Sequence, residues 1–284
     1  MKVIGIGDNI VDKFLDRRVY YPGGNSVNFA VFARQCGAEA SYLGVFGTDA
    51  LARSIKDALE DCDVDYSLSP EVEGETGWAS VNVEGGDRVF VEWNEGGVTR
   101  SHPLVLDEAQ LAHVSTFDLA HLGVYGEVAS QVHRIAELGP VVVYDFSAEE
   151  EFRTDEYIGA LAPHLDFAQF SCAELGDEGI ESLLRRVVDA GAGVALATRG
   201  SDGSVLFDGT RFYRQDATTV ENPLDTMGCG DAFLASVTTS FLKEGWQRGQ
   251  RPAPTTITRA LEEAAAFAAR QCLTEGAFEH GQGF

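Results

Sequence analysis

The chain has 284 residues, of which 44% are apolar and 23% charged, the balance of a soluble folded protein rather than of a disordered one. Its 21 basic and 45 acidic side chains give a formal net charge of −24. A surface this negative repels phosphate backbones and argues against nucleic-acid binding. The sequence contains no run of about 18 consecutive apolar residues, which excludes a membrane span.

Five cysteines are scattered along the chain without a Cys-x-x-Cys pair. This pattern argues against a disulfide framework and a zinc site. Asp8 follows the first apolar residues too early for the core of a signal peptide, so we expect a cytoplasmic protein. The acid excess fits two interpretations equally well, a host with a salty cytoplasm and an ordinary acidic protein with an arginine bias.

Short apolar runs alternate with helical patterns from the N-terminus onward, which predicts a mainly parallel sheet covered by helices. The expected strands are residues 3–7, 40–46, 119–123, 141–146, 166–170 and 194–198. The expected helices are residues 26–35, 49–59 with Thr48 as N-cap, 127–138, 174–190, 231–243 and 256–273. No repeat or linker-like segment divides the sequence, so we expect one α/β domain.

Two segments interrupt this alternation. Residues 78–83 and 88–93 predict a hairpin around Glu84-Gly85-Gly86-Asp87, and residues 14–21 form a partly alternating stretch. Together they predict a small sheet apart from the main one, suited to act as a lid. A further hairpin, with strands 204–207 and 211–214, is expected near the end of the main sheet.

The most informative segment is 225–233, Asp-Thr-Met-Gly-Cys-Gly-Asp-Ala-Phe. Its small residues Gly228, Cys229 and Gly230 let the backbone approach a ligand, and their N–H groups at a helix N-terminus favour an anion. Asp231 would weaken a site for a bare anion. It fits phosphoryl transfer, in which a carboxylate accepts the proton of an attacking hydroxyl. The alternative is a helix capped by an acid after a glycine turn.

Residues 225–231, Asp-Thr-x-Gly-x-Gly-Asp, resemble the signature of the ribokinase-like (PfkB) carbohydrate kinases. A second match begins with Gly7-Asp8-Asn9-Ile10-Val11-Asp12 and continues with Gly23-Gly24-Asn25-Ser26-Val27-Asn28. The resemblance extends over nearly the whole chain. It implies a single domain over residues 1–284, a three-layer α/β/α sandwich with a mainly parallel central sheet. It also implies a small β-sheet lid formed by about residues 13–22 and 76–100.

The resemblance implies an ATP-dependent sugar kinase in which Asp231 is the catalytic base and the amides of Gly228, Cys229 and Gly230 form an anion hole. The residues implied to hold sugar hydroxyls are Asp12, Gly24, Asn25 and Asn28. The residues implied to contact the nucleotide are Thr198, Arg199, Gly200, Gly203 and Asn222.

The resemblance also implies residues that bind cations at two further positions. Ser171-Cys172-Ala173-Glu174 stands where the family has Asn-x-x-Glu, which implies that Glu174 organises Mg²⁺ through water although the asparagine is missing. Magnesium is also expected because it neutralises the phosphate oxygens. Many relatives use a monovalent cation near the residue matching Asp225, and the use of K⁺ stays open here.

Cys229 stands where the family usually has alanine. It is either a small buried filler or a thiol made acidic by the helix N-terminus. In the second case we expect ATP to protect it from alkylation.

Within the family the sequence is most similar to the fructoselysine 6-kinase group, in its N-terminal motifs, in Asp87-Arg88-Val89-Phe90 and in Asp145-Phe146-Ser147. The implied substrate is a fructosamine, a ketose with an amino acid on C1, phosphorylated at its 6-hydroxyl. Arg88 is expected to meet the substrate carboxylate, and Glu92 and Glu95 its secondary ammonium.

The alternatives left open are a kinase for fructose, 2-keto-3-deoxygluconate, ribose or a nucleoside, and a non-catalytic sugar-binding sensor. The aromatic residues Trp78, Phe90 and Trp93 of the expected hairpin indicate either a cover for the substrate or a homodimer formed through the lids.

Overall fold

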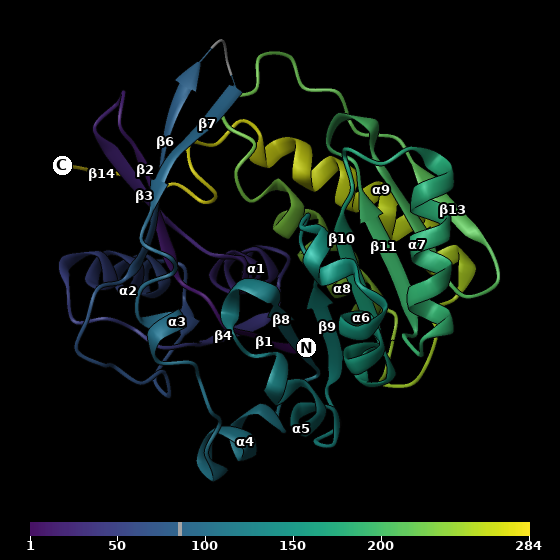
Figure 1. Ribbon diagram of the computed structural model, residues 1–284. Helices are drawn as coiled ribbons and strands as arrows, with labels where there is room; N and C mark the ends of the chain where they lie inside the picture. The colour runs from purple at the N-terminus through teal and green to yellow at the C-terminus, as the bar shows by residue number, and fades with distance from the viewer. Residues whose placement is uncertain (85–86) are drawn as a thin grey trace.

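The computed structural model describes residues 1–84 and 87–284, and for residues 83–84 and 87–90 it describes the backbone alone. Its main sheet has nine strands in the order β13-β12-β11-β10-β9-β8-β1-β4-β5 (Figure 1). Pairing is parallel from β11 to β5 and antiparallel for β12 and β13. In sequence order these strands are β1 Lys2–Ile6, β4 Glu39–Leu43, β5 Val64–Asp65, β8 Leu119–Gly123, β9 Val141–Asp145, β10 Phe167–Ser171, β11 Val194–Thr198, β12 Ser204–Phe207 and β13 Phe212–Gln215.

Helices cover both faces of this sheet, which is why its central strands are apolar at nearly every position. Along β9, Val141 and Val143 pack against the helices of one face, while Val142 and Tyr144 pack against those of the other. The first face carries α1 Asn25–Gln35, α2 Ala50–Asp61, α8 Cys229–Lys243 and α9 Pro254–Gln271. The second carries α4 Glu108–Val114, α5 Val132–Ala136, α6 Asp155–Leu161 and α7 Asp177–Asp189. The expected α/β/α sandwich is confirmed.

A second sheet of five strands, in the order β14-β3-β2-β6-β7, stands beside the sandwich (Figure 1). Its strands are β2 Ile10–Phe14, β3 Val19–Gly23, β6 Gly77–Glu84, β7 Asp87–Trp93 and β14 Gln282–Gly283. Strands β2 and β6 pair in parallel, and the other neighbours are antiparallel. The predicted stretch 14–21 therefore becomes a hairpin, and the C-terminal strand β14 was not expected. The single-domain division and the action of this sheet as a lid stay predictions.

Several expected helix boundaries are wrong. The N-cap of α2 is Asp49 rather than Thr48, because its carboxylate accepts the backbone N–H of Ala52 at 2.8 Å. The expected helix 127–138 is replaced by a 3₁₀ turn, Ala129–Gln131, and the short helix α5, and Glu127 lies before both in a left-handed conformation with φ of 53°. The remaining short helices are α3 Val98–Ser101 and the 3₁₀ turns Val124–Gly126, Ala129–Gln131, Glu150–Arg153, Ala162–His164 and Gly200–Asp202. Among the described residues, no helix has the length and apolarity needed to cross a membrane.

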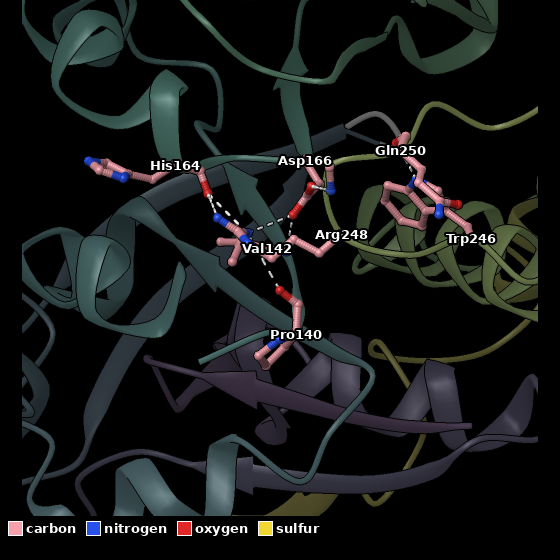
Figure 2. A network of polar contacts seen from close by, with 8 residues as sticks. Pro140, Val142, His164, Asp166, Trp246, Arg248 and Gln250 are labelled. Atoms are coloured by element: carbon pink, nitrogen blue, oxygen red, sulfur yellow. Dashed lines mark hydrogen bonds and ion pairs between the residues drawn. The ribbon is translucent and has the colours of Figure 1, made fainter. Parts of the chain in front are cut away.

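The amino ends of the parallel strands are held by the buried carboxylate of Asp166 (Figure 2). It accepts the backbone N–H groups of Val142, at 2.8 Å, and Gly249, at 2.6 Å. The guanidinium of Arg248 lies 2.8 Å from it and also donates to the carbonyl oxygens of Pro140 and His164. This network ties β9 and β10 to the loop between α8 and α9, at the edge opposite the carboxyl ends of the strands.

Replacing Arg248 with methionine is expected to lower the free energy of unfolding by about 2–3 kcal/mol, because it leaves the buried carboxylate without its cationic partner. Urea denaturation measures the change. Arg34→Met is the matched control, since the ion pair of Arg34 with Asp63 is exposed and contributes under about 1 kcal/mol. Equal effects of the two substitutions would contradict the structural role of this network.

Candidate active site

The first turn of α1 is positioned by Gly24 and Asp8. Gly24 has a φ of 107°, and a Cβ there would lie 2.8 Å from a carboxylate oxygen of Asp8, so glycine is required. The same carboxylate accepts the backbone N–H groups of Asn25, at 2.8 Å, and Ser26, at 3.2 Å. Burial raises the pKa of Asp8, although these hydrogen bonds act to lower it. Asp8 was missed as a site residue. Its place next to Gly7, directly after β1, was the signal available in the sequence.

The first turn of α8 also follows a glycine with positive φ, in a different conformation from Gly24. Gly228 is the N-cap in the left-handed conformation with φ of 69°, and a Cβ there would lie 2.8 Å from the Cβ of Ala277. Asp231 follows in the first turn and is 9% exposed. The Asn28 side-chain nitrogen donates to its carboxylate at 2.8 Å. This contact joins the two predicted motifs directly.

Asp12, in β2, is buried beside these two residues. A Cβ on Gly23 would lie 3.1 Å from Oδ2 of Asp12 and 3.7 Å from Oδ1 of Asn28, so both groups face the same point. That Oδ1 is buried and has no hydrogen-bond partner among the described residues, which leaves it available to a hydroxyl donor. The structure thus brings Asp12, Asn28 and Asp231 together.

Asp145, the last residue of β9, belongs to the same site and was not predicted as a site residue. Its carboxylate accepts the Asn25 side-chain N–H at 2.7 Å and the backbone N–H of Ser147 at 2.8 Å. Burial raises its pKa to about 6, helped by the negative charges of Asp8 and Glu149. The tripeptide 145–147 had pointed only to a subgroup of the family.

The pKa of Asp231 is raised well above its usual range. Burial is the largest cause, and the negative charges of Asp145, Asp8 and Asp12 add to it, while the hydrogen bond from Asn28 acts against it. A carboxylate whose pKa lies closer to neutrality is a better proton acceptor in the transition state. The geometry therefore presents a buried base at a helix N-terminus, next to a cluster of hydroxyl-binding groups.

The Cys229 side chain turns away from this cluster toward α9. Its sulfur lies 3.1 Å from the sulfur of Cys272 and 3.6 Å from the carbonyl oxygen of Ala268. Cys229 is half-buried rather than buried, so its role as a small filler stays a prediction. Protection of the thiol by ATP stays a prediction.

The predicted nucleotide loop follows β11. Thr198 ends the strand, and Gly203 closes a 3₁₀ turn with φ of 84°. A Cβ at Gly200 would meet no described atom within 4 Å, so the surface above it is open to a ligand. Arg199 forms ion pairs with Asp177, at 3.1 Å, and with Asp202, at 3.8 Å. Asn222 is exposed, with φ of 56°, in the loop before the signature.

The predicted cation residues both have protein partners. Glu174, half-exposed, lies 2.5 Å from the buried Arg153. Partial burial acts to raise its pKa, but hydrogen bonds from the backbone and from Arg153 lower it. Asp225 accepts the backbone N–H groups of Met227, at 3.0 Å, and Gly276, at 3.2 Å. In the described part of the chain no three His, Cys, Asp or Glu side chains gather to hold a metal ion. The Arg88 side chain lies outside the described residues.

The chain matches the pfkB family of carbohydrate kinases over residues 11–279. It is 35% identical to fructosamine kinase FrlD of Bacillus subtilis over 99% of this chain and 94% of the relative. It is 31% identical to fructoselysine 6-kinase of Escherichia coli over 96% and 98% of the two chains. The fold matches that of the fructokinase of Xylella fastidiosa solved with bound ATP, with a TM-score of 0.79 and 17% identity over 98% and 94% of the chains. With Asp231 and its glycine turn in place, the chain belongs to the pfkB family of carbohydrate kinases and is an ATP-dependent sugar phosphotransferase.

Proposed function

We propose that this kinase transfers the γ-phosphoryl group of ATP to the 6-hydroxyl of a fructosamine such as fructoselysine. The observation that carries the substrate class is the 35% identity to a fructosamine kinase over 99% of the chain. The buried groups Asp12, Asn28 and Asp231 supply the hydroxyl-binding and proton-accepting side chains that a sugar acceptor needs.

In the proposed reaction, Asp231 accepts the proton of the 6-hydroxyl while that oxygen attacks the γ-phosphorus. The new bond joins O6 to phosphorus, and the bond from phosphorus to the bridging oxygen of ADP breaks. The backbone amides of Gly228, Cys229 and Gly230 donate to the transferring group. The remaining hydroxyls of the sugar form hydrogen bonds with Asp12, Asn25 and Asn28, which orient it. Gly24 has no side chain, so the sugar can lie close to the backbone there.

The nucleotide and its cations fit the residues present. Gly200 leaves open surface beside Thr198, Arg199 and Gly203, and Asn222 is proposed to approach the nucleotide. The Glu174 carboxylate is half-exposed, so it can accept from a water of Mg²⁺. When bound, Mg²⁺ neutralises charge on the phosphates. Asp225 is the proposed neighbour of K⁺.

Substrate selectivity tests the proposal. We expect kcat/KM for fructoselysine to exceed that for fructose by at least about 100-fold. Fructose lacks the charged amino-acid part of the substrate, so it would leave the protein groups that bind this part unpaired. Initial rates of ADP release measure both, with ribose, 2-keto-3-deoxygluconate and adenosine as further acceptors. A ratio near one, or preference for another acceptor, would reject the fructosamine assignment and keep the kinase.

In this proposal the lid contacts the amino-acid part of the fructosamine. Arg88→Ala is expected to raise KM for fructoselysine about tenfold and leave KM for fructose unchanged, because only the conjugate carries a carboxylate. Glu92 and Glu95 are the proposed partners of the ammonium. Arg53→Ala on the exposed face of α2 controls for the loss of a positive charge. An equal change in KM for both sugars would remove Arg88 from the binding site.

We also propose that two copies associate through their small sheets. Val91 is 52% exposed and Trp93 57% exposed on β7, a large apolar surface for a monomer to leave in water. Sedimentation equilibrium is expected to give the mass of a dimer, and Trp93→Lys that of a monomer. A monomeric parent protein would contradict this association.

A further inference from the structure

Gln169 lies in β10, between β9 and β11 of the main sheet, and has no role in the proposed reaction. It is the third residue of β10 and is 1% exposed. In the sheet it is paired in parallel register with Asp145 of β9 and Leu196 of β11. Register partners in parallel strands point to the same face. The Gln169 side chain therefore faces α1 and α8, on the same side as Asp145.

This side chain reaches the glycine turn of α8. Outside the neighbouring residues and the backbone of its own helix, the heavy atom nearest to the position that a Cβ of Gly230 would take is Nε2 of Gln169, at 3.9 Å. The space over Gly230, where a transferring phosphoryl group would meet the turn, is thus bordered by a side-chain amide. A primary amide is a hydrogen-bond donor, which suits an anionic oxygen.

Packing alone does not explain an amide at this position. Oε1 of Gln169 is buried and finds no hydrogen-bond donor among the described residues. A buried polar atom without a partner destabilises the fold, and a hydrocarbon side chain of the same length would avoid this penalty. Phe167 and Leu196, beside it on the same face, are apolar and join the core.

We infer that Gln169 is a catalytic residue whose side-chain amide donates a hydrogen bond to the γ-phosphoryl group as it is transferred, opposite the backbone amides of the Gly228–Gly230 turn. The amide places a neutral donor on the same side as the acidic side chains of Asp145 and Asp231. It supplies a donor without adding positive charge that would lower the pKa of Asp231. This inference rests on the kinase activity and not on which sugar accepts the phosphoryl group.

Gln169→Met tests the inference, because methionine keeps the length of the side chain and removes both polar atoms. We expect kcat to fall about 10²-fold, the usual effect of removing one oxyanion donor. Calorimetry should show about tenfold weaker binding of adenosine 5′-(β,γ-imido)triphosphate and unchanged binding of ADP, since only the triphosphate analogue carries a γ-phosphoryl group. The Tm of the unliganded protein should stay the same or rise, because the unpartnered acceptor is gone.

Gln131→Met is the matched control. Gln131 is also a buried glutamine, but its Oε1 accepts from the backbone N–H of Leu106, at 3.3 Å, and from Arg134, at 2.8 Å. This variant should lose Tm and keep kcat, the reverse of Gln169→Met. Wild-type kcat in Gln169→Met, or a lowered Tm with equal loss of ADP and analogue binding, would overturn the inference. The nucleotide measurements need no sugar, so they decide the role of Gln169 even if the fructosamine assignment fails.

Discussion

Asp231→Asn is expected to lower kcat by roughly 10²–10⁴-fold, the contribution of a general base, with little change in the affinity for sugar or nucleotide. An asparagine keeps the size of the side chain and can still accept the 2.8 Å hydrogen bond from Asn28. It cannot take the proton of the attacking hydroxyl. Steady-state kinetics with saturating MgATP measure the loss.

The same substitution should not destabilise the fold. Burial and the neighbouring carboxylates raise the pKa of Asp231, so its ionised form is less favourable in the folded protein than in the unfolded chain. A neutral amide removes that penalty, and we expect Tm to stay the same or rise. Asp155→Asn, at an exposed first-turn acid of α6, is the matched control and should keep full activity. Retention of most activity by Asp231→Asn would remove Asp231 from its role as base.

The second large effect is expected in the pH dependence of kcat/KM. Asp231 must be ionised to accept a proton, so kcat/KM should fall about tenfold for each pH unit below its pKa. Because that pKa is raised well above 3.8, the acid limb should lie well above the range of an ordinary carboxylate. Asp145, whose pKa burial raises to about 6, acts on Asp231 through its charge, so the limb reports on the pair of residues.

Asp145→Asn separates the two residues. Among the charged groups, Asp145 raises the pKa of Asp231 the most, so removing its charge favours the ionised form of Asp231. The acid limb should therefore move to lower pH, whatever the variant does to the maximum rate. Rate profiles from pH 5 to 9 measure the midpoint, with Asp57→Asn on the exposed face of α2 as control. A midpoint that stays in place or moves to higher pH would contradict the electrostatic coupling.

The parts of the site that depend on local chemistry could be predicted from the sequence. Asp231 and its glycine turn are recognisable because a helix N-terminus, small residues and a carboxylate act together within a few positions. Asp12 and Asn28 followed from the second motif. The alternation of apolar runs was enough for the layers of the sandwich, since each run is long enough to be buried on both faces.

Residues brought in by the topology could not be predicted. Asp145 becomes a site residue because β9 ends beside α1, 120 residues away from Asn25. Gln169 depends in the same way on the register of β10. The two-residue strand β14 carries no apolar pattern, and its pairing with β3 arises only in the folded chain. The choice between Thr48 and Asp49 as N-cap rested on which side chain reaches the N–H of Ala52, which sequence does not show.

The position of phosphate on the product tests the central claim most directly. Fructoselysine, MgATP and the wild-type protein are incubated to completion, and ¹H–³¹P correlation spectra locate the phosphate, with Asp231→Asn as the parallel control. The account predicts one equivalent of ADP and a single phosphate ester whose phosphorus couples to the two protons on C6. Phosphate on another carbon, or no ester from fructoselysine under conditions in which another sugar is phosphorylated, would contradict it.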